Sequence, residues 1–145
     1  MADFQSVGTL TESPSYTTSP IAAGSYPAGT PVYKLSNGQV APARANALAT
    51  SAVLGMLLEA SQEGEPVDVQ WGGSFKLTDL QWQQVLGTSS GGLTTGVIYY
   101  LSDAVAGEIT ATPPTTVGHF VVQLGIAEFT TNFFLQLGPP QVAPL

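Results

Sequence analysis

One short stretch of the chain has the spacing of a serine nucleophile motif. Residues 87–91 read Gly-Thr-Ser-Ser-Gly and match the G-x-S-x-G elbow of hydrolases, and Asp103 and His119 follow in the order that such a triad needs. An elbow requires a strand before the serine and a helix after it, whereas the local pattern predicts a helix before and a strand after. We therefore interpret residues 87–91 as a Gly/Ser loop and His119 as a polar residue at a strand start. We expect no enzymatic activity.

Four acidic side chains gather around one predicted turn. They are Glu59, Glu63, Glu65 and Asp68. Clustered carboxylates are ligands that calcium prefers, but their spacing matches no known calcium loop, so a solvated turn is the better interpretation. Trp82 has the chemistry to stack on a sugar, although packing is the commoner role of a single tryptophan. The sequence predicts neither a metal nor a cofactor.

The chain is unusually poor in charge. Only 9% of its 145 residues are charged and 43% are hydrophobic, whereas roughly one quarter of residues are charged in typical soluble domains. Three basic residues stand against ten acidic ones, for a net charge of -7. No basic stripe can neutralise phosphates, so we expect no nucleic-acid binding. The absence of cysteine excludes disulfides and thiolate sites, and a surface so sparsely charged favours contacts with other chains.

Neither the first residues nor the longest apolar run indicates a membrane location. The first residues, Met-Ala-Asp-Phe-Gln, have neither the basic nor the apolar region of a secretory signal peptide. The longest apolar run, residues 51–60, is short and ends beside an acid, whereas a helix that crosses a bilayer needs about 20 apolar residues. We expect a protein that is made in the cytoplasm and has no membrane partner.

Strand and turn patterns predict a single, mainly β domain at residues 29–138. Asn37-Gly38 lies between two apolar-rich runs and favours a hairpin with a type I′ turn. Residues 43–50 predict a helical or irregular link, followed by a strand near 52–59. Residues 67–71 alternate apolar and polar side chains, which predicts a strand, and the following FKLT is the expected hairpin partner.

One short helix is predicted at about residues 79–86. Thr78-Asp79-Leu80-Gln81 has the form of a capping box, and Gly87 can end the helix about two turns later. We expect its apolar side chains, with Trp82 among them, to cover an open end of a sheet.

The chain contains two similar halves, at about residues 29–77 and 91–138. PVYKLSN aligns with VIYYLSD at an offset of 66 residues (99 minus 33). The aligned pairs include Tyr33 with Tyr99, Gly55 with Gly125, and Gln70 with Gln136. The alternative is that two sheets acquired the same strand and turn chemistry independently. The repeat predicts two small sheets around one core, that is, a small β-sandwich or tulip-like β domain from two related halves.

Both ends of the chain are expected to lie outside this domain. Residues 1–28 carry the separate aromatics Phe4, Tyr16 and Tyr26 among Ser, Thr and Pro, with no sustained period. This pattern predicts an extended N-terminal arm that becomes ordered against a neighbouring chain and uses its aromatics as anchors. A frayed terminus with one strand is the alternative. Residues 139–145, after Pro139-Pro140, are expected to form a C-terminal tail.

Adjacent phenylalanines mark the last predicted strand. Phe133 and Phe134 must face opposite sides of the sheet, because side chains alternate along a strand. One can enter the core, and the other must be covered by the arm, a helix or another subunit. The candidate protein-binding residues are therefore Phe4, Tyr16, Tyr26, Phe133 and Phe134.

Two passages of the chain resemble proteins of tailed bacteriophages. The passage from Gln81 to Pro140, which contains GGLTTGVIYYLSDAVAGEITATPP, resembles a module common in their virion proteins. The passage from Ala28 to Gly73, which contains PVYKLSNGQVA, is similar to small capsid cement, or decoration, proteins. Together the two passages cover about residues 28–140.

The resemblance implies a protein without catalysis that binds the outer capsid surface of the virion. Such proteins usually form homotrimers and hold adjacent capsomers together, so the major capsid protein and further copies of the chain are the expected partners. The first module also occurs in tail appendages. A phage tail-fibre or baseplate receptor-binding module is therefore the alternative.

Overall fold

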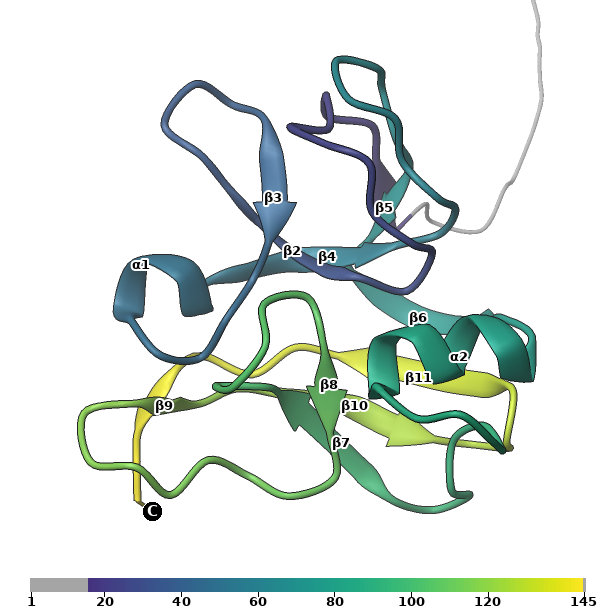
Figure 1. Cartoon of the computed structure of the whole chain (residues 1–145), viewed down its shortest axis with the longest axis vertical. Helices are drawn as coiled ribbons and strands as arrows, with labels where there is room; N and C mark the ends of the chain where they lie inside the picture. Colours follow the sequence, from purple (N-terminus) through teal and green to yellow (C-terminus); the bar gives the residue numbers. More distant parts are fainter. Residues whose placement is uncertain (1–15, 145) are drawn as a thin grey trace, which may run out of the picture.

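The computed structural model describes residues 16–144 and shows a mainly β protein with two antiparallel sheets (Figure 1). The first sheet, in the order β1-β5-β4-β2-β3, contains β1 (Thr17–Thr18), β2 (Pro31–Lys34), β3 (Val40–Pro42), β4 (Val53–Leu57) and β5 (Val69–Gln70). The second sheet, in the order β6-β11-β10-β7-β8, contains β6 (Gly72–Lys76), β7 (Ile98–Leu101), β8 (Ile109–Thr110), β10 (Gln123–Ala127) and β11 (Asn132–Gln136). The main core lies between them. The predicted fold class, a small β-sandwich, is confirmed.

Two helices and a short pair of strands complete the fold. They are α1 (Leu48–Ser51), α2 (Asp79–Leu86), β9 (Phe120–Val121) and β12 (Gln141–Val142). α2 has the predicted bounds: the Thr78 hydroxyl accepts from the Gln81 N–H at 3.1 Å, and the Thr78 N–H donates to the Gln81 side chain at 2.9 Å. Gly87 ends the helix with φ 70°. α1 adds a second, very short helix at the end of the predicted link.

The two sheets repeat one topology. When β1 to β5 are matched in turn to β6, β7, β8, β10 and β11, the two strand orders become identical. The register agrees too: Val32 lies opposite Gly55, Tyr99 lies opposite Gly125, and each pair adjoins an irregularity typical of a β-bulge. The fold therefore contains two related halves.

Two pairs of the sequence alignment are wrong by one or two residues. The strand register makes Tyr33 equivalent to Tyr100 rather than to Tyr99, and Gln70 equivalent to Phe134, two residues before the aligned glutamine. A shift of one residue exchanges the two faces of a strand. The alignment matched residue types, whereas the register follows which side chains the core buries.

Aromatic side chains fill the centre of the main core. The rings of Phe75, Trp82, Tyr99 and Phe133 contact one another with centroids between 5.6 and 6.2 Å apart. Trp82 is fully buried, and its indole N–H donates to the Thr131 carbonyl at 2.8 Å. Trp82 thus has a packing role, which is the interpretation that the sequence analysis favoured over stacking on a sugar.

The segment before β2 belongs to the domain, so the predicted arm boundary at residue 28 is wrong. A second apolar cluster on the other face of the first sheet contains Ala22, Val32, Val40, Leu57, Val67 and Val69. Residues 20–23 pair on one side with Val40 and on the other with residues 65–67: the Ala23 N–H donates to the Val40 carbonyl and the Val67 N–H to the Pro20 carbonyl, both at 2.9 Å. This pairing satisfies backbone groups that a free arm would leave to water.

The C-terminal segment is also packed rather than a free tail. β12 pairs with β9, and Ala143 is buried, with its N–H donating to the His119 carbonyl at 2.9 Å. The prediction of a free tail was wrong because β12 pairs through backbone groups with β9, which is distant in sequence. No local sequence pattern indicates such a pairing.

β6 is not the hairpin partner of residues 67–71, contrary to the prediction. β5 pairs with β1 and β4, whereas β6 pairs with β11 and places Phe75 opposite Phe133. Gly73, the second residue of β6, has φ 80°, a conformation that glycine adopts without strain just after the chain enters the second sheet. Burial of Phe75 in the aromatic core favours this exchange of sheets.

The hairpin at Asn37-Gly38 is present with a longer loop than predicted. The Gly38 N–H donates to the Leu35 carbonyl at 2.9 Å, and the Leu35 N–H to the Gln39 carbonyl at 2.8 Å. The loop therefore spans residues 36–38, and Gly38 adopts φ 88°. A three-residue loop that ends in a left-handed glycine replaces the predicted type I′ turn.

Candidate functional site

A row of large apolar side chains is exposed on the outer face of the second sheet. Ile98, Ile126 and Phe134 lie side by side across β7, β10 and β11, and each is 37% exposed. Ser74 of β6 lies opposite Phe134 and donates its hydroxyl to Glu128 at 2.8 Å. Contiguous exposed apolar side chains are typical of protein contact surfaces. This row, together with Tyr100, Gln123 and Gln136 further along the same strands, is called the open face below.

The equivalent row of the first sheet is buried. Pro31, Met56 and Gln70 occupy the matching positions, and the exposed fractions of Met56 and Gln70 are 0% and 9%. Gln70 donates its side-chain amide to the carbonyls of Gly72 and Ser74 at 2.7 and 3.1 Å. The same position in the repeat is thus an interior surface in one half and an exterior surface in the other.

A pocket of about 390 Å³ adjoins the apolar row. It is lined by Tyr100, Val121, Gln123, Gln136, Leu137, Gly138, Pro139 and Gln141. Within residues 16–144, the three glutamine side-chain amides and the Tyr100 hydroxyl have no hydrogen-bond partner. The lining carries no charge, so a ligand would be held by neutral hydrogen bonds and apolar contacts.

Tyr16 and Trp71 form an exposed aromatic pair beside the open face. Their ring centroids are 5.1 Å apart at an interplanar angle of 80°, and the side chains are 42% and 44% exposed. The Tyr16 ring packs over Gly72, which lies opposite Gln136 of the open face. Because Tyr and Trp are enriched among residues that dominate interface energies, this pair extends the candidate contact surface past β6.

The sequence-predicted contact residues lie in different places. Phe133 is buried in the main core and Phe134 is on the open face, as alternation predicts. Tyr16 belongs to the exposed aromatic pair, whereas Tyr26 packs against the second apolar cluster of its own domain. Phe4 lies outside the described residues.

Ile98, Ile126 and Gln123 belong to the open face, although no sequence motif singled them out. Their signal is the alternation of β7 and β10, whose burial patterns place these residues on the exposed side. Alternation alone leaves open which face of a strand is buried.

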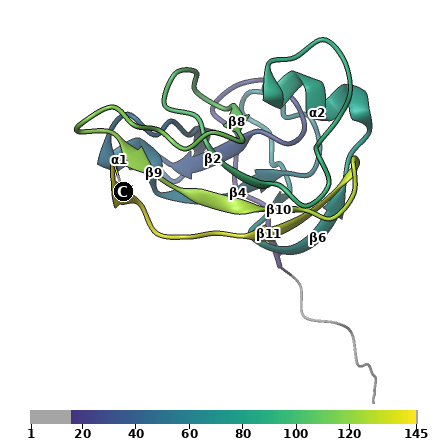
Figure 2. The same cartoon turned by 90° about the horizontal axis from the view of Figure 1, so that it is seen from below.

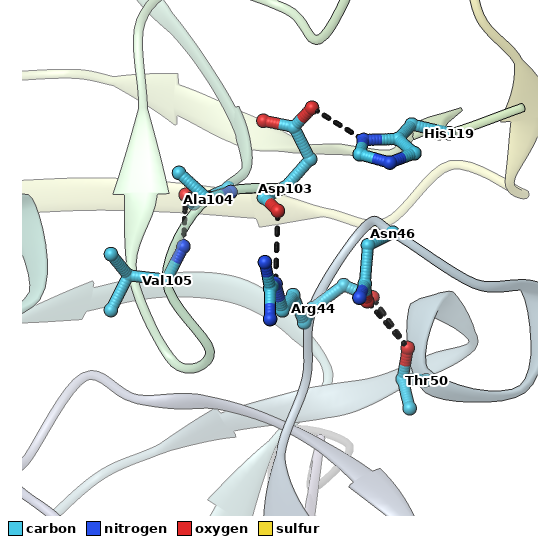
Figure 3. A network of polar contacts seen from close by, with 8 residues as sticks. Arg44, Asn46, Thr50, Asp103, Ala104, Val105 and His119 are labelled. Atoms are coloured by element: carbon cyan, nitrogen blue, oxygen red, sulfur yellow. Dashed lines mark hydrogen bonds and ion pairs between the residues drawn. The ribbon is translucent and has the colours of Figure 1, made fainter. Parts of the chain in front are cut away.

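A polar network joins the two halves close to β9 (Figure 3). His119 Nδ1 and Asp103 Oδ2 are 2.8 Å apart, and Arg44 Nε donates to the Asp103 carbonyl at 2.9 Å. The Thr50 hydroxyl donates in turn to the Arg44 carbonyl at 2.7 Å. Since Arg44 belongs to the first half and Asp103 to the second, the network fixes their junction.

The fold does not assemble the serine motif into a triad. Residues 87–91 directly follow α2, whereas His119 directly precedes β9, and α2 and β9 lie at opposite ends of the molecule in both views (Figures 1 and 2). No serine hydroxyl within residues 16–144 is hydrogen-bonded to His119. A nucleophile needs its base within hydrogen-bond reach, so residues 87–91, Asp103 and His119 are not arranged as a triad.

The acidic turn does not form a metal site in the described part of the chain. No three histidine, aspartate or glutamate side chains of residues 16–144 converge on one point. Asp68 instead accepts a hydrogen bond from the Ser19 hydroxyl at 2.7 Å. Among the same residues, no helix is long and apolar enough to cross a bilayer.

Comparisons with known proteins add no assignment. The chain matches no protein-family model, and no curated protein is significantly similar to it in sequence.

Proposed function

We propose that the protein is a structural virion protein that binds the outer surface of a phage capsid and stabilises contacts between capsomers. The observation that carries the proposal is the open face, whose apolar row is exposed although the equivalent row of the first sheet is buried. The biological setting comes from the resemblance of residues 28–73 to capsid decoration proteins and of residues 81–140 to a module of phage virion proteins. The major capsid protein is the proposed partner, and copies of the chain associate as homotrimers.

The physical basis of attachment is apolar burial. Each square ångström of apolar surface removed from water stabilises a complex by about 25 cal/mol, and the Tyr16–Trp71 pair adds large rigid side chains next to the row. Because the side chains of the open face carry no charge, ionic bonds to the shell contribute little there. Attachment should therefore depend only weakly on salt concentration.

A receptor-binding module of a phage tail fibre or baseplate is the second candidate. The uncharged pocket lined by Tyr100, Gln123 and Gln136 favours it, because amides and an aromatic ring suit neutral sugars. The two candidates predict different locations in the virion.

Location in the particle tests the proposal. Purified chain is added to complete particles, shell and tail together, of the phage that encodes it, and the particles are imaged by electron microscopy. Regularly spaced copies over the shell, with occupancy reduced by Phe134→Ser and unchanged by Leu80→Ser, are expected, because Leu80 is 68% exposed on α2. Density confined to tails would support the second candidate, and absence from both structures would reject the virion role.

A further inference from the structure

One edge strand of the second sheet is long enough to take up a further strand. β6 lies at the end of its sheet and pairs with β11 alone. Its five residues make it the longest edge strand in the part of the chain that the structure describes, where β1, β3 and β8 have two or three residues each. Unpaired backbone groups along such an edge are a template for pairing with another chain. A monodisperse protein must therefore protect the free edge of β6.

Every second residue of β6 directs its backbone groups to this free edge. The Phe134 carbonyl lies against Gly125 of β10, so the backbone groups of Phe134 face β10 and not β6. Ser74, which lies opposite Phe134, is therefore in a pair without hydrogen bonds, and its N–H and C=O point away from β11. Because the direction alternates along a strand, the backbone groups of Gly72 and Lys76 also face the edge.

The side chain of Gln70 occupies two of these edge carbonyls. Its amide nitrogen donates to the Gly72 carbonyl at 2.7 Å and to the Ser74 carbonyl at 3.1 Å. Gln70 is the last residue of β5, and a single residue separates it from β6, so the amide reaches the edge from within the same chain. An added antiparallel strand would donate its own N–H groups to the same two carbonyls. Gln70 is buried, which shields the two hydrogen bonds from competition with water.

Three other features protect the same edge. The Tyr16 ring packs over Gly73, and Gly73 itself departs from regular strand geometry with φ 80°. Lys76, one of three basic residues in the chain, is exposed at the end of β6 and has no acidic partner within residues 16–144. Lysine and irregular backbone on an edge strand are means by which β proteins avoid edge-to-edge pairing. The strand is thus protected along its length.

We propose that Gln70 is an autoinhibitory edge cap, which occupies the acceptors of β6 and prevents this edge from pairing with a β-strand of a second copy of the chain. Two β6 edges are self-complementary, because antiparallel pairing about a twofold axis lets each strand supply the N–H groups that the carbonyls of the other accept. The Ser74 N–H faces the edge and has no partner among residues 16–144, so it is available for such a bond. The cap does not depend on the proposed virion role.

Replacement of Gln70 in the full chain tests the cap. Gln70→Met keeps a side chain of similar length and removes the amide. Sedimentation velocity should show that this variant self-associates at a concentration at least about tenfold lower than the wild type does. Gln62→Met, on an exposed turn, adds the same apolar side chain away from any sheet edge and should behave as the wild type. Circular dichroism checks that both variants are folded.

A proline on the same edge distinguishes strand pairing from general apolar association. Ser74→Pro removes an N–H that faces the free edge, so it costs no hydrogen bond between β6 and β11, yet it blocks an added strand. The double variant Gln70→Met, Ser74→Pro should therefore return to the association state of the wild type. Ser74→Pro alone should match the wild type.

Hydrogen exchange tests the contact in the wild-type protein. The side-chain amide of Gln70 should exchange with solvent at least about tenfold more slowly than that of Gln136, which has no partner within residues 16–144. NMR of the labelled protein resolves the two amides. If Gln70→Met does not fold, Gln70→Asn takes its place, because its shorter side chain draws the amide back from the two carbonyls.

Three results would overturn the cap. They are a folded Gln70 variant that associates no more than the wild type, association that Ser74→Pro does not reverse, and a Gln70 amide that exchanges as fast as that of Gln136. Association of the variant together with its reversal by proline supports the cap, whether or not the protein attaches to phage particles.

Discussion

Met56 and Ile126 occupy the same position in two equivalent strand pairs, yet Met56 is fully buried and Ile126 is 37% exposed. Both follow a glycine that lies opposite the first strand of a hairpin, Gly55 in one half and Gly125 in the other. The difference between the two residues comes from their neighbours. The second half covers Met56, and no described part of the chain covers Ile126 to the same extent.

Substitution of either glycine should strongly destabilise the protein. A Cβ on Gly55 would overlap the Gln70 carbonyl oxygen, and a Cβ on Gly125 would overlap the Phe134 carbonyl oxygen. Gly55→Ala and Gly125→Ala should each lower the free energy of unfolding by about 2–4 kcal/mol, because backbone must move to relieve the overlap. Gly138→Ala, whose Cβ would have ordinary contacts, is the control. Urea denaturation that ranks all three variants alike would contradict the close approach.

Truncation should destabilise the protein strongly at Phe133 and only slightly at Phe134. Phe133→Ala leaves a cavity in the aromatic core and should lower the free energy of unfolding by about 3–5 kcal/mol. Phe134→Ser removes a partly exposed ring and should change it by less than about 1 kcal/mol. Thermal or urea unfolding measures both values. Equal losses would mean that both rings are buried in solution.

Alkaline pH should weaken the packing of the segment around Tyr26. Burial raises the pKa of the Tyr26 hydroxyl, and the charges of Glu63 and Tyr33 add to the effect. Since the folded pKa exceeds the unfolded value, this contribution to stability is fully present below about pH 10 and is lost as pH rises through the folded pKa. The stability difference between wild type and Tyr26→Phe, measured by urea denaturation, should therefore shift against the wild type above about pH 10. A constant difference would refute the raised pKa.

Removal of the segment before β2 should unfold the first sheet. A chain that starts at residue 29 lacks β1 and Ala22, so the second apolar cluster, with Val40 and Val67, becomes exposed. A chain that starts at residue 16 keeps every described contact and should fold. Proteolysis and circular dichroism compare the two. A stable, cooperatively folded chain from residue 29 would restore the predicted boundary of the arm.

Ser61 provides a single-residue test of how the segment before β2 is held against the domain. Its hydroxyl accepts from the Tyr26 N–H at 2.9 Å and donates to the Gly24 carbonyl at 2.8 Å. Ser61→Ala leaves both groups unsatisfied and should lower the free energy of unfolding by about 1–3 kcal/mol. Ser25→Ala, at an exposed position, should have little effect. Indistinguishable variants would show that the segment is not held there.

Features decided by near neighbours were predictable from the sequence. The capping box at Thr78, the end of α2 at Gly87 and the hairpin around Gly38 depend on contacts within a few residues. The opposite orientations of Phe133 and Phe134 follow from the geometry of a single strand. The equivalence of Gly55 and Gly125 was also predictable, because the bulged strand pair of each half requires a glycine at this position.

The tertiary structure alone decided which segments pair and which faces are covered. The partner of β6 is β11 rather than its neighbour in sequence, and residues 16–28 and 139–144 dock through backbone hydrogen bonds that any residue types can make. Side-chain alternation divides Ile126 and Gln123 from the core-facing residues, but it does not say what lies on either side of the sheet. The exposure of the open face depends on how the two halves stack, which is a property of long-range packing and not of any local sequence.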